Sequence, residues 1–306
     1  WLNEEWIAAL LEGIFECFNV KEDAEISIEC NPGTLTLNKL LTYRDAGVNR
    51  LSIGLQSTND EELRLLGRIH TYDQFVKNYE MARNVGYKNI SVDLMYGLPQ
   101  QTTEKYLDTV NRIVRLKPDH ISAYSLIVEK GTPFYEKYKF DMVKQEAGMR
   151  TEFLPNEDEL YEMEKAGQAQ LFDAGYKQYE ISNYAKNNMA CRHNIGYWTR
   201  ENYLGLGIGA ASLLDNVRYT NTSDIDKYLS GCRNIHDMKE DVFRTNLHIS
   251  ADVIDRKAQM EEFMFLGLRM NEGVTREAFE KSFGISIDAI YKNIIDDLKN
   301  QDLLVV

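Results

Sequence analysis

Short stretches in which apolar residues alternate with small or polar ones recur along the first half of the chain. In the clearest, residues 50–56, large apolar side chains alternate with small ones and the pattern stops at the amide of Gln56. This pattern predicts a buried strand. The same alternating pattern recurs in three other stretches. Residues 25–29 end on Glu29, residues 89–96 carry Asp93, and residues 120–127 end near Ile127.

Amphipathic segments of helical length separate these strands. They predict helices over residues 1–20, about 37–46, 60–66, 72–85 and 103–116. Gly47 and Gly86 stand where two of these helices should end, because a left-handed glycine commonly ends a helix. Thr71 and Thr102 stand where the side chain can cap the first turn of a helix.

The alternation of strands and helices, with polar groups at the strands' carboxyl ends, is typical of a parallel barrel or a doubly wound sheet. Residues 1–127 supply only four such strands, whereas a full barrel has eight in about 250 residues. Either the sheet is incomplete or its first strands precede Trp1, and we favour the second because the chain begins with a helix. The predicted fold class is α/β, a partial barrel that resembles a TIM barrel.

The second half of the chain is less regular. Residues 137–155 are polar and predict a surface loop, 157–173 predict a helix, and 178–182 predict a strand. From residue 250 the pattern predicts about three helices, in the order of a winged-helix domain. We therefore expect three parts: a truncated barrel over 1–135, an extension over 136–249 that packs on it, and a helical domain over 250–306.

Composition and charge exclude several classes of function. The 306 residues are 43% hydrophobic and 27% charged, as in an ordinary soluble protein, and no apolar run is long enough for a membrane helix. The net charge of −13 argues against nucleic acid as a partner, and residues 251–306 carry seven Lys and Arg against eleven Asp and Glu. With no signal-like leader in the chain, these features predict a cytoplasmic protein.

The four cysteines, Cys17, Cys30, Cys191 and Cys232, lie far apart in the sequence. None forms a Cys-x-x-Cys pair, so the spacing supports neither a zinc site nor a disulfide framework. We expect reduced and mostly buried thiols, and no metal ligand among them.

The polar residues of the predicted strand ends and one nearby arginine form the main candidate site: Glu29, Gln56, Arg68 and Asp93. A carboxylate accepts hydrogen bonds from an ammonium group or from ribose hydroxyls, and arginine clamps a carboxylate with two hydrogen bonds. Together these groups suit a zwitterionic, nucleoside-like ligand better than a phosphate. The alternative is that they satisfy backbone groups at the rim of the sheet.

Two later segments are also dense in candidate residues. Residues 205–209 hold alternating glycines but lack the Gly-Lys-Ser/Thr ending of a phosphate-binding loop, so close backbone packing is the favoured interpretation. Residues 191–198 combine a thiol, His193, Tyr197 and Trp198. Such a set can contact a flat macrocycle or its iron, although these residues can equally be structural.

Six blocks together resemble the radical S-adenosylmethionine family of oxygen-independent coproporphyrinogen III oxidases, and most closely its heme-chaperone branch. The blocks are Glu-Cys-Asn-Pro at 29–32, Ile-Gly-Leu-Gln-Ser at 53–57, Leu-Gly-Arg-Ile-His at 66–70, Asp-Leu-Met-Tyr-Gly-Leu-Pro at 93–99, Tyr-Glu-Ile-Ser-Asn at 179–183 and Cys-Arg-His-Asn with Tyr-Trp over 191–198. They occur in order over nearly the whole chain. Residues 262–269 also resemble the start of that family's C-terminal domain.

The resemblance implies a barrel of six strand–helix units and assigns roles to the candidate residues. Glu29 would hold the methionine end of S-adenosylmethionine, Gln56 and Arg68 its polar groups, and Asp93 the ribose region. Met95 and Ile127 match positions that line the nucleoside pocket. His193, Tyr197 and Trp198 are the candidates for contact with heme.

The chain departs from the family in two places. The cluster motif Cys-x-x-x-Cys-x-x-Cys and the segment Gly-Gly-Gly-Thr-Pro-Ser, both expected upstream of Trp1, are not in this sequence. We therefore expect no [4Fe–4S] cluster and no radical chemistry in this chain by itself, and we assign no catalytic residue to it. Ala211 stands where chaperone relatives often carry histidine, which weakens a heme-ligand role for that segment.

Three functions remain open. The first is a heme chaperone that binds S-adenosylmethionine and heme and serves a heme-acceptor protein. The second is the oxidase itself, which converts two propionates of coproporphyrinogen III to vinyl groups. The third is a barrel without catalytic activity that binds a protein partner. The forms of the blocks at 29–32 and 66–70 favour the chaperone.

Overall fold

The computed structural model describes residues 2–186, 188–234 and 247–305. They form two compact units, unit 1 over Trp1–Cys191 and unit 2 over Arg192–Val306. The predicted division into three parts, at residues 135 and 249, stays a prediction. Within the described ranges no helix is both long and apolar enough to cross a membrane.

Unit 1 is built around a mostly parallel sheet with the strand order β1-β2-β3-β4-β6-β5. The strands are β1 (Ser27–Cys30), β2 (Arg50–Gln56), β3 (Asn89–Tyr96), β4 (His120–Ser125), β5 (Lys177–Gln178) and β6 (Asn183–Ala185). Strands β1 to β4 pair in parallel, which confirms the predicted α/β class. Strand β6 pairs antiparallel with β4, and β5 antiparallel with β6, so this edge of the sheet does not continue the strand–helix repeat.

The helices of unit 1 are α1 (Glu4–Cys17), α2 (Leu37–Asp45), α3 (Asp60–Leu65), α4 (Tyr72–Val85), α5 (Thr103–Leu116), α6 (Pro133–Glu146) and α7 (Glu157–Asp173). Helices α4, α5 and α7 have the predicted bounds. Thr71 closes a capping box at the start of α4, and Thr102 caps α5. A capping side chain also starts α7, at Asn156, and these caps explain why the bounds could be predicted.

Two predictions in unit 1 are wrong. The predicted loop over 137–155 is helical up to Glu146, because Thr132 caps α6 and Pro133 occupies its first turn. Helix α6 buries only Tyr138 and Asp141, so it lacks the apolar pattern by which a helix is recognised. The predicted strand over 178–182 is mostly a turn between β5 and β6.

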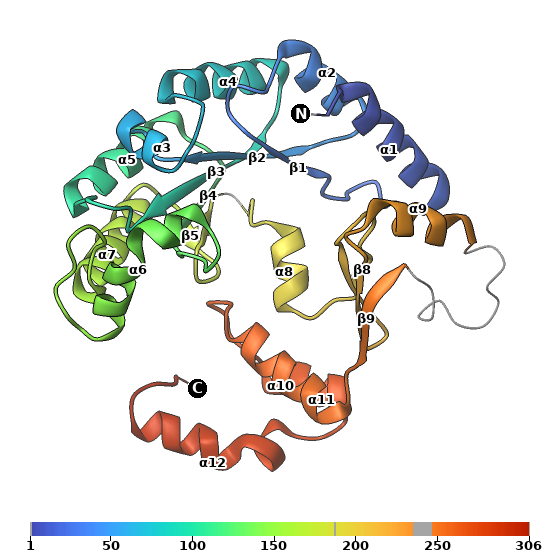
Figure 1. The fold of residues 1–306 in the computed structure, drawn as a ribbon. Coiled ribbons are helices and arrows are strands. Elements are labelled where there is room, and N and C mark those ends of the chain that lie inside the picture. Colours follow the sequence, from blue (N-terminus) through green and yellow to red (C-terminus); the bar gives the residue numbers. More distant parts are fainter. Residues whose placement is uncertain (1, 187, 235–246, 306) are drawn as a thin grey trace. The chain divides into compact units, whose positions relative to one another are not determined.

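The two faces of the sheet differ in chemistry. One face of β2 and β3 is apolar and fully buried: Leu51, Ile53, Leu55, Ile90, Val92 and Leu94. These side chains belong to the main core, against the helices, and α1, α2, α4 and α5 lie along this side of the sheet (Figure 1). The intervening residues of the same strands point to the opposite face and are mostly polar.

Unit 2 contains the short helix α8 (Arg192–Trp198), helix α9 (Ile225–Asn234) and an antiparallel sheet of β7 (Ala211–Leu214), β8 (Val217–Asn221) and β9 (His248–Val253). The sequence pattern did not predict this sheet. Helices α10 (Arg256–Gly267), α11 (Arg276–Phe283) and α12 (Ile287–Asn300) confirm the predicted C-terminal helices. Their core centres on Met260, Phe279, Ile287 and Ile295.

The glycines of residues 205–209 have the predicted packing role. A side-chain Cβ on Gly205 would lie 2.2 Å from the carbonyl oxygen of Ala211, so no larger residue fits there. Gly207 and Gly209 have positive φ angles of 98° and 68°, which favour glycine.

Candidate functional site

The polar face of the unit 1 sheet carries most of the predicted site residues. On β3 it presents Asp93 and Met95, and on β4 it presents Ser122 and Tyr124. The parallel register sets Asp93 beside Ser122 and Met95 beside Tyr124. Because the strands run in the same direction, the end of β2 at Gln56 lies at the same edge of the sheet.

Tyr124 is the centre of this group, and the sequence analysis did not single it out. Its hydroxyl donates a hydrogen bond of 2.9 Å to Oε1 of Gln56. Burial raises the pKa of Tyr124, the negative charges of Asp93 and Glu29 raise it further, and the hydrogen bond to Gln56 and the charge of Arg68 oppose them. All four residues of the predicted constellation therefore act on one hydroxyl group.

Gln56 is held in an unusual conformation at the end of β2. It is buried, its φ angle is 78°, and the pairing between β2 and β3 shifts register between Ile53 and Gln56. A Cβ on Gly54 would lie 3.2 Å from Nε2 of Gln56, so glycine at this position leaves room for the amide. A positive φ angle is unusual for glutamine, and local backbone strain of this kind is common at binding sites.

Asp93 is a half-buried carboxylate, and its pKa lies close to neutral pH. Burial raises the pKa of Asp93 to about 6, against the opposing effect of a hydrogen bond from Ser122. The nearby negative charge of Glu29 also raises it. The hydroxyl of Ser52 lies 3.5 Å from Oδ1 of Asp93. At pH 7 this group is mostly an ionised acceptor, although holding its charge in this environment costs free energy.

The other predicted residues of this site differ in exposure. Glu29 is exposed on β1 and Arg68 is half-buried between α3 and α4. Met95 is half-buried on the same face of β3 as Asp93. Ile127 lies two residues beyond β4 with 78% of its surface exposed, so it lines no closed pocket in this structure.

The side chains of this face fit S-adenosylmethionine by the chemistry of their donors and acceptors. Two carboxylates can accept from an ammonium group and from ribose hydroxyls, Arg68 can pair with a carboxylate, and the Gln56 amide can both donate and accept. The residues present do not fit an iron–sulfur cluster. Over the described ranges, no three Cys, His, Asp or Glu side chains are grouped as a metal ion would require.

The four cysteines are present as thiols, and two of them are buried, fewer than expected. Cys30 and Cys191 are buried, Cys17 is exposed and Cys232 is half-buried. Burial raises the pKa of Cys30 to about 12, so its thiol is unreactive at neutral pH. The thiol of Cys191 donates to a carboxylate oxygen of Glu25 at 3.6 Å.

A buried histidine lies on the same polar face, nearer the start of the strands. His120 on β4 has Nδ1 2.8 Å from the Ser91 hydroxyl and Nε2 2.9 Å from the Tyr179 hydroxyl. Burial lowers the pKa of His120 to about 3, and the positive charge of Arg50 contributes. His120 is therefore neutral at physiological pH and holds strands β3 and β4 to the turn that carries Tyr179.

The three candidates for heme contact, all on α8, do not form one group. The ring of His193 meets Tyr197 edge-on, with ring centroids 4.6 Å apart, and Tyr197 meets Tyr203 in the same way at 4.6 Å. Trp198 instead contacts the guanidinium of Arg269, which lies 4.2 Å from the centre of its ring. The structure thus joins His193 and Tyr197 to Tyr203, a residue that the sequence analysis missed.

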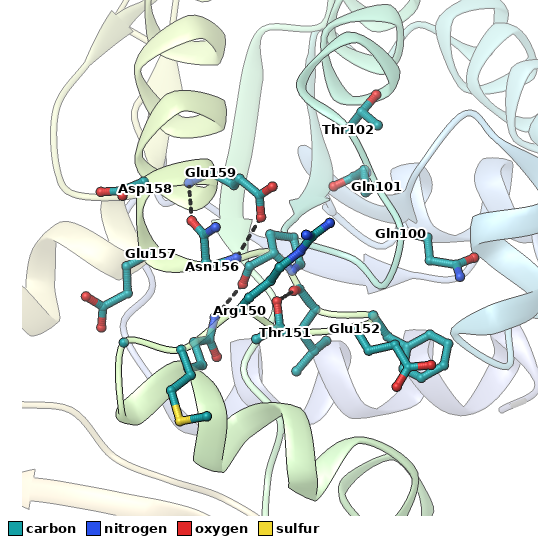
Figure 2. A pocket seen from close by; sticks show the side chains of 16 residues that line it. Gln100, Gln101, Thr102, Arg150, Thr151, Glu152, Asn156, Glu157, Asp158 and Glu159 are labelled. Atoms are coloured by element: carbon teal, nitrogen blue, oxygen red, sulfur yellow. Dashed lines mark hydrogen bonds between the residues drawn. The ribbon is translucent and has the colours of Figure 1, made fainter.

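A cavity of about 740 Å³ lies at the periphery of unit 1, between residues 100–102 and the segment 145–159 (Figure 2). Asp141 holds this segment, since its carboxylate accepts from the backbone N–H groups of Glu152, Phe153 and Leu154. The residues lining this cavity include none of the predicted site residues that the structure describes.

Comparisons with known proteins identify the family. The family model "Radical SAM superfamily" matches residues 3–113, and "HemN C-terminal domain" matches residues 254–306. The heme chaperone HemW of Lactococcus lactis is 34% identical over 303 residues, which are 99% of this chain and 75% of that protein. The heme chaperone HemW of Bacillus subtilis is also 34% identical, over 99% of this chain and 76% of that protein.

The fold has a close counterpart among solved structures. Coproporphyrinogen III oxidase (HemN) from Escherichia coli superposes with a TM-score of 0.77 at 22% identity, over 98% of this chain and 68% of that one. At this level of identity the likeness shows the fold alone. On the evidence of the sequence relatives, the chain belongs to the heme chaperone HemW family of radical S-adenosylmethionine proteins.

Proposed function

We propose that this protein is a heme chaperone that binds S-adenosylmethionine on the polar face of unit 1, binds heme, and passes the heme to an acceptor protein. Two relatives of 34% identity that are named heme chaperones support the heme part of this proposal. The radical S-adenosylmethionine family implies that cofactor and a [4Fe–4S] cluster. The described residues offer no ligand set for the cluster, so no step is assigned to it here.

The contact between Tyr124 and Gln56 is the observation that carries the first half of the proposal. It fixes Oε1 of Gln56 as an acceptor, which leaves the amide N–H groups to donate to a ligand. Around it, Glu29 would accept from the ammonium group of the methionine end and Arg68 would pair with its carboxylate. Asp93 would accept from the ribose hydroxyls.

Calorimetric titration of S-adenosylmethionine into the purified, full-length protein tests this assignment. We expect Arg68→Lys and Asp93→Asn each to lower the affinity by about tenfold or more, because each removes a charged hydrogen bond. The fold should be unchanged in circular dichroism. Lys77→Gln, which removes an exposed charge on α4, should bind as the wild type does. Unchanged affinity in both site variants would place the cofactor elsewhere.

Heme titration followed by absorbance tests the second half. If His193 is an axial ligand, His193→Ala shifts the heme spectrum and leaves the melting temperature nearly unchanged, because His193 is exposed on α8. If His193 is structural, the variant keeps the wild-type heme spectrum and melts earlier. The second result would remove His193 from the site, and absence of heme binding by the wild type would overturn the proposed function.

A further inference from the structure

The backbone of Gln56 adopts a conformation that glutamine does not favour. Its φ angle is 78°, in the left-handed region, and the pairing of β2 with β3 shifts register just before it. Such a conformation costs free energy and persists only where the surrounding structure holds it. The contacts that hold this part of the chain therefore determine where the Gln56 amide lies.

A buried carboxylate holds the residue that follows Gln56. Oε2 of Glu62, on α3, accepts a hydrogen bond of 2.5 Å from the Ser57 hydroxyl. The same oxygen accepts from Nε2 of Gln101 at 3.1 Å. All three side chains are buried, so solvent does not weaken these hydrogen bonds. Glu62 thus joins the end of β2 to the turn between β3 and α5.

The next residue of the chain is held by α5. Oγ1 of Thr109 lies 3.1 Å from Oγ1 of Thr58 and accepts from the Thr58 backbone N–H at 3.4 Å. On the other side of Gln56, Nε2 of the buried His70 lies 3.2 Å from the carbonyl oxygen of Leu55. The chain on both sides of Gln56 is therefore fixed by side chains from outside β2.

The two oxygens of Glu62 differ in their contacts. Oε2 accepts both hydrogen bonds, whereas Oε1 is shielded from solvent and has no partner among the residues that the structure describes. The contact therefore needs one acceptor oxygen, which an amide supplies as well as a carboxylate does. A side chain of similar size without an oxygen would leave the donors of Ser57 and Gln101 without this acceptor.

We propose that Glu62 is a positioning residue of the S-adenosylmethionine site, and that it acts through Ser57 to hold the Gln56 amide in its ligand-binding position. This inference rests on the proposed function and adds a residue that affects the ligand only through Gln56. Tyr124 fixes Oε1 of that amide, and Ser57 anchors the backbone that follows it. A shift of this backbone would misdirect the free N–H groups of the amide, although every ligand-binding side chain would still be present.

Calorimetric titration of S-adenosylmethionine into the purified, full-length protein compares variants at neighbouring positions of α3. Glu62→Met removes the acceptor at nearly constant volume and should lower the affinity by about tenfold, a loss that is common when the support of a ligand-binding group is removed. Glu62→Gln keeps an acceptor oxygen and should retain the wild-type affinity within about twofold. Glu61→Met makes the same change at an exposed position and should bind as the wild type does.

A second comparison shows whether Glu62 acts through Gln56. Gln56→Gly removes the amide and tolerates the positive φ angle, so it should itself weaken binding. In this background Glu62→Met should lower the affinity by no more than about twofold, because the group that it positions is gone. An equal loss in both backgrounds would overturn the inference, since Glu62 would then affect the ligand by another route.

The outcomes distinguish this inference from the proposed function. Wild-type affinity in Glu62→Met would overturn the inference and leave the site in place. An equal loss in Glu62→Gln and Glu62→Met would also overturn it, because the charge and not the acceptor would then matter. No binding by the wild type would overturn the proposed site itself.

Ser57→Ala provides the test if Glu62→Met fails to fold. It removes the hydroxyl that donates to Glu62 and leaves the contact with Gln101 in place. The affinity should fall by about threefold, as expected for the loss of one hydrogen bond. Unchanged affinity in this variant would overturn the inference.

Discussion

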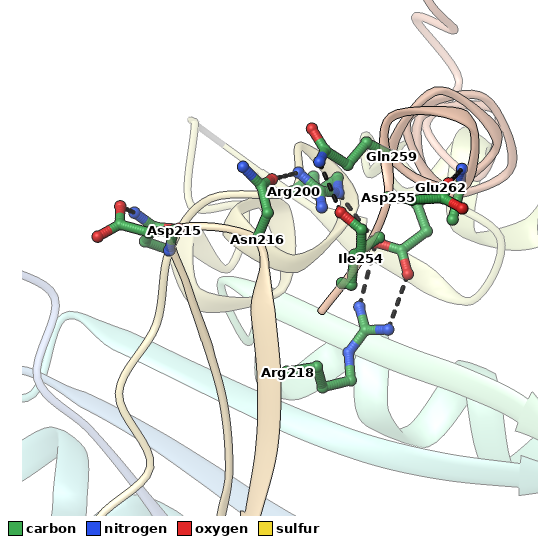
Figure 3. Close-up of polar contacts among 10 residues, drawn as sticks. Arg200, Asp215, Asn216, Arg218, Ile254, Asp255, Gln259 and Glu262 are labelled. Carbon is green, nitrogen blue, oxygen red and sulfur yellow. Dashed lines mark hydrogen bonds and ion pairs between the residues drawn. The ribbon is translucent and has the colours of Figure 1, made fainter. Parts of the chain in front are cut away.

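The two polar regions of the molecule differ in how their charges are balanced. The polar face of unit 1 combines two carboxylates, Glu29 and Asp93, with two arginines, Arg50 and Arg68, and its members are coupled through Tyr124 and His120. In unit 2, Glu262 pairs directly with Arg200 and Arg218, and we call these three residues the arginine cluster (Figure 3). The second region is joined by direct ion pairs, whereas the first is coupled through neutral side chains.

This difference predicts different responses to substitution. The charges of the polar face can pair with the two ends of a zwitterion, so substitutions there should change ligand binding. The charges of the arginine cluster are already joined in ion pairs, so substitutions there should mainly change stability. The following variants change the balance in one region and leave the other unaltered.

Glu262→Gln should have the largest effect on stability. It removes the only carboxylate that pairs with Arg200 and Arg218 in the described structure, so both charges remain without a counter-ion. Breaking a buried ion pair from one side costs about 3–5 kcal/mol of unfolding free energy, which urea denaturation measures. The neighbouring Glu261→Gln, at an exposed site paired with Lys257, should cost under about 0.5 kcal/mol. Equal losses in both variants would show that the arginine cluster is not strained by its charge.

His120→Gln tests the neutral centre of the polar face by its dependence on pH. Burial lowers the pKa of His120 from 6.5 in the unfolded chain to about 3 in the fold. The unfolded state therefore takes up the proton first, and the stability present above pH 6.5 is lost as pH falls. Between pH 6.5 and about 4.5 the wild type should lose about 2–3 kcal/mol more than the variant, in which glutamine cannot titrate. Parallel pH curves would contradict the buried, neutral state.

The sequence predicted the polar face of unit 1 better than it predicted the arginine cluster, and the reason is the range of the interactions. Strands β2 and β3 show their two faces in a local alternation, so the strand ends at Gln56 and near Asp93 could be found by pattern alone. Tyr124 could not be predicted, because its role depends on the register of β4 with β3 and on the irregular end of β2.

The arginine cluster has no local signal. Arg200 and Arg218 lie 62 and 44 residues from Glu262 in the chain, so their partnership exists only after folding. The sheet of β7, β8 and β9 was not predicted for the same reason, since β8 pairs with β9 across the segment 222–247. Helix α6 was not predicted because it buries too few apolar residues to show a helical period.

Asp93→Asn should stabilise the fold at the expense of the site. Burial raises the pKa of Asp93 from 3.8 to about 6, so the folded state binds the proton more strongly. Stability is then lost as pH rises through this window, and the ionised group costs about 1–3 kcal/mol at pH 7.5, allowing for its partial exposure. The variant should recover that amount at pH 7.5 and nothing near pH 4, as chemical denaturation at the two values measures. A destabilised variant at pH 7.5 would mean that the carboxylate is well solvated or paired.

Tyr124→Phe should have the smallest effect, and it tests whether the four predicted residues work as one group. The variant removes the hydroxyl that donates to Gln56 at 2.9 Å and leaves the ring in place. Loss of one such hydrogen bond costs about 0.5–1.5 kcal/mol, and a released Gln56 amide should weaken S-adenosylmethionine binding by a few-fold. Tyr161→Phe is the matched control, because Tyr161 on α7 is 61% exposed and away from the strand ends. Calorimetry should therefore separate the two variants in their affinity for S-adenosylmethionine. If Tyr124→Phe binds S-adenosylmethionine as tightly as Tyr161→Phe does, the hydroxyl does not position Gln56, and the balanced charges of the polar face act on the ligand separately.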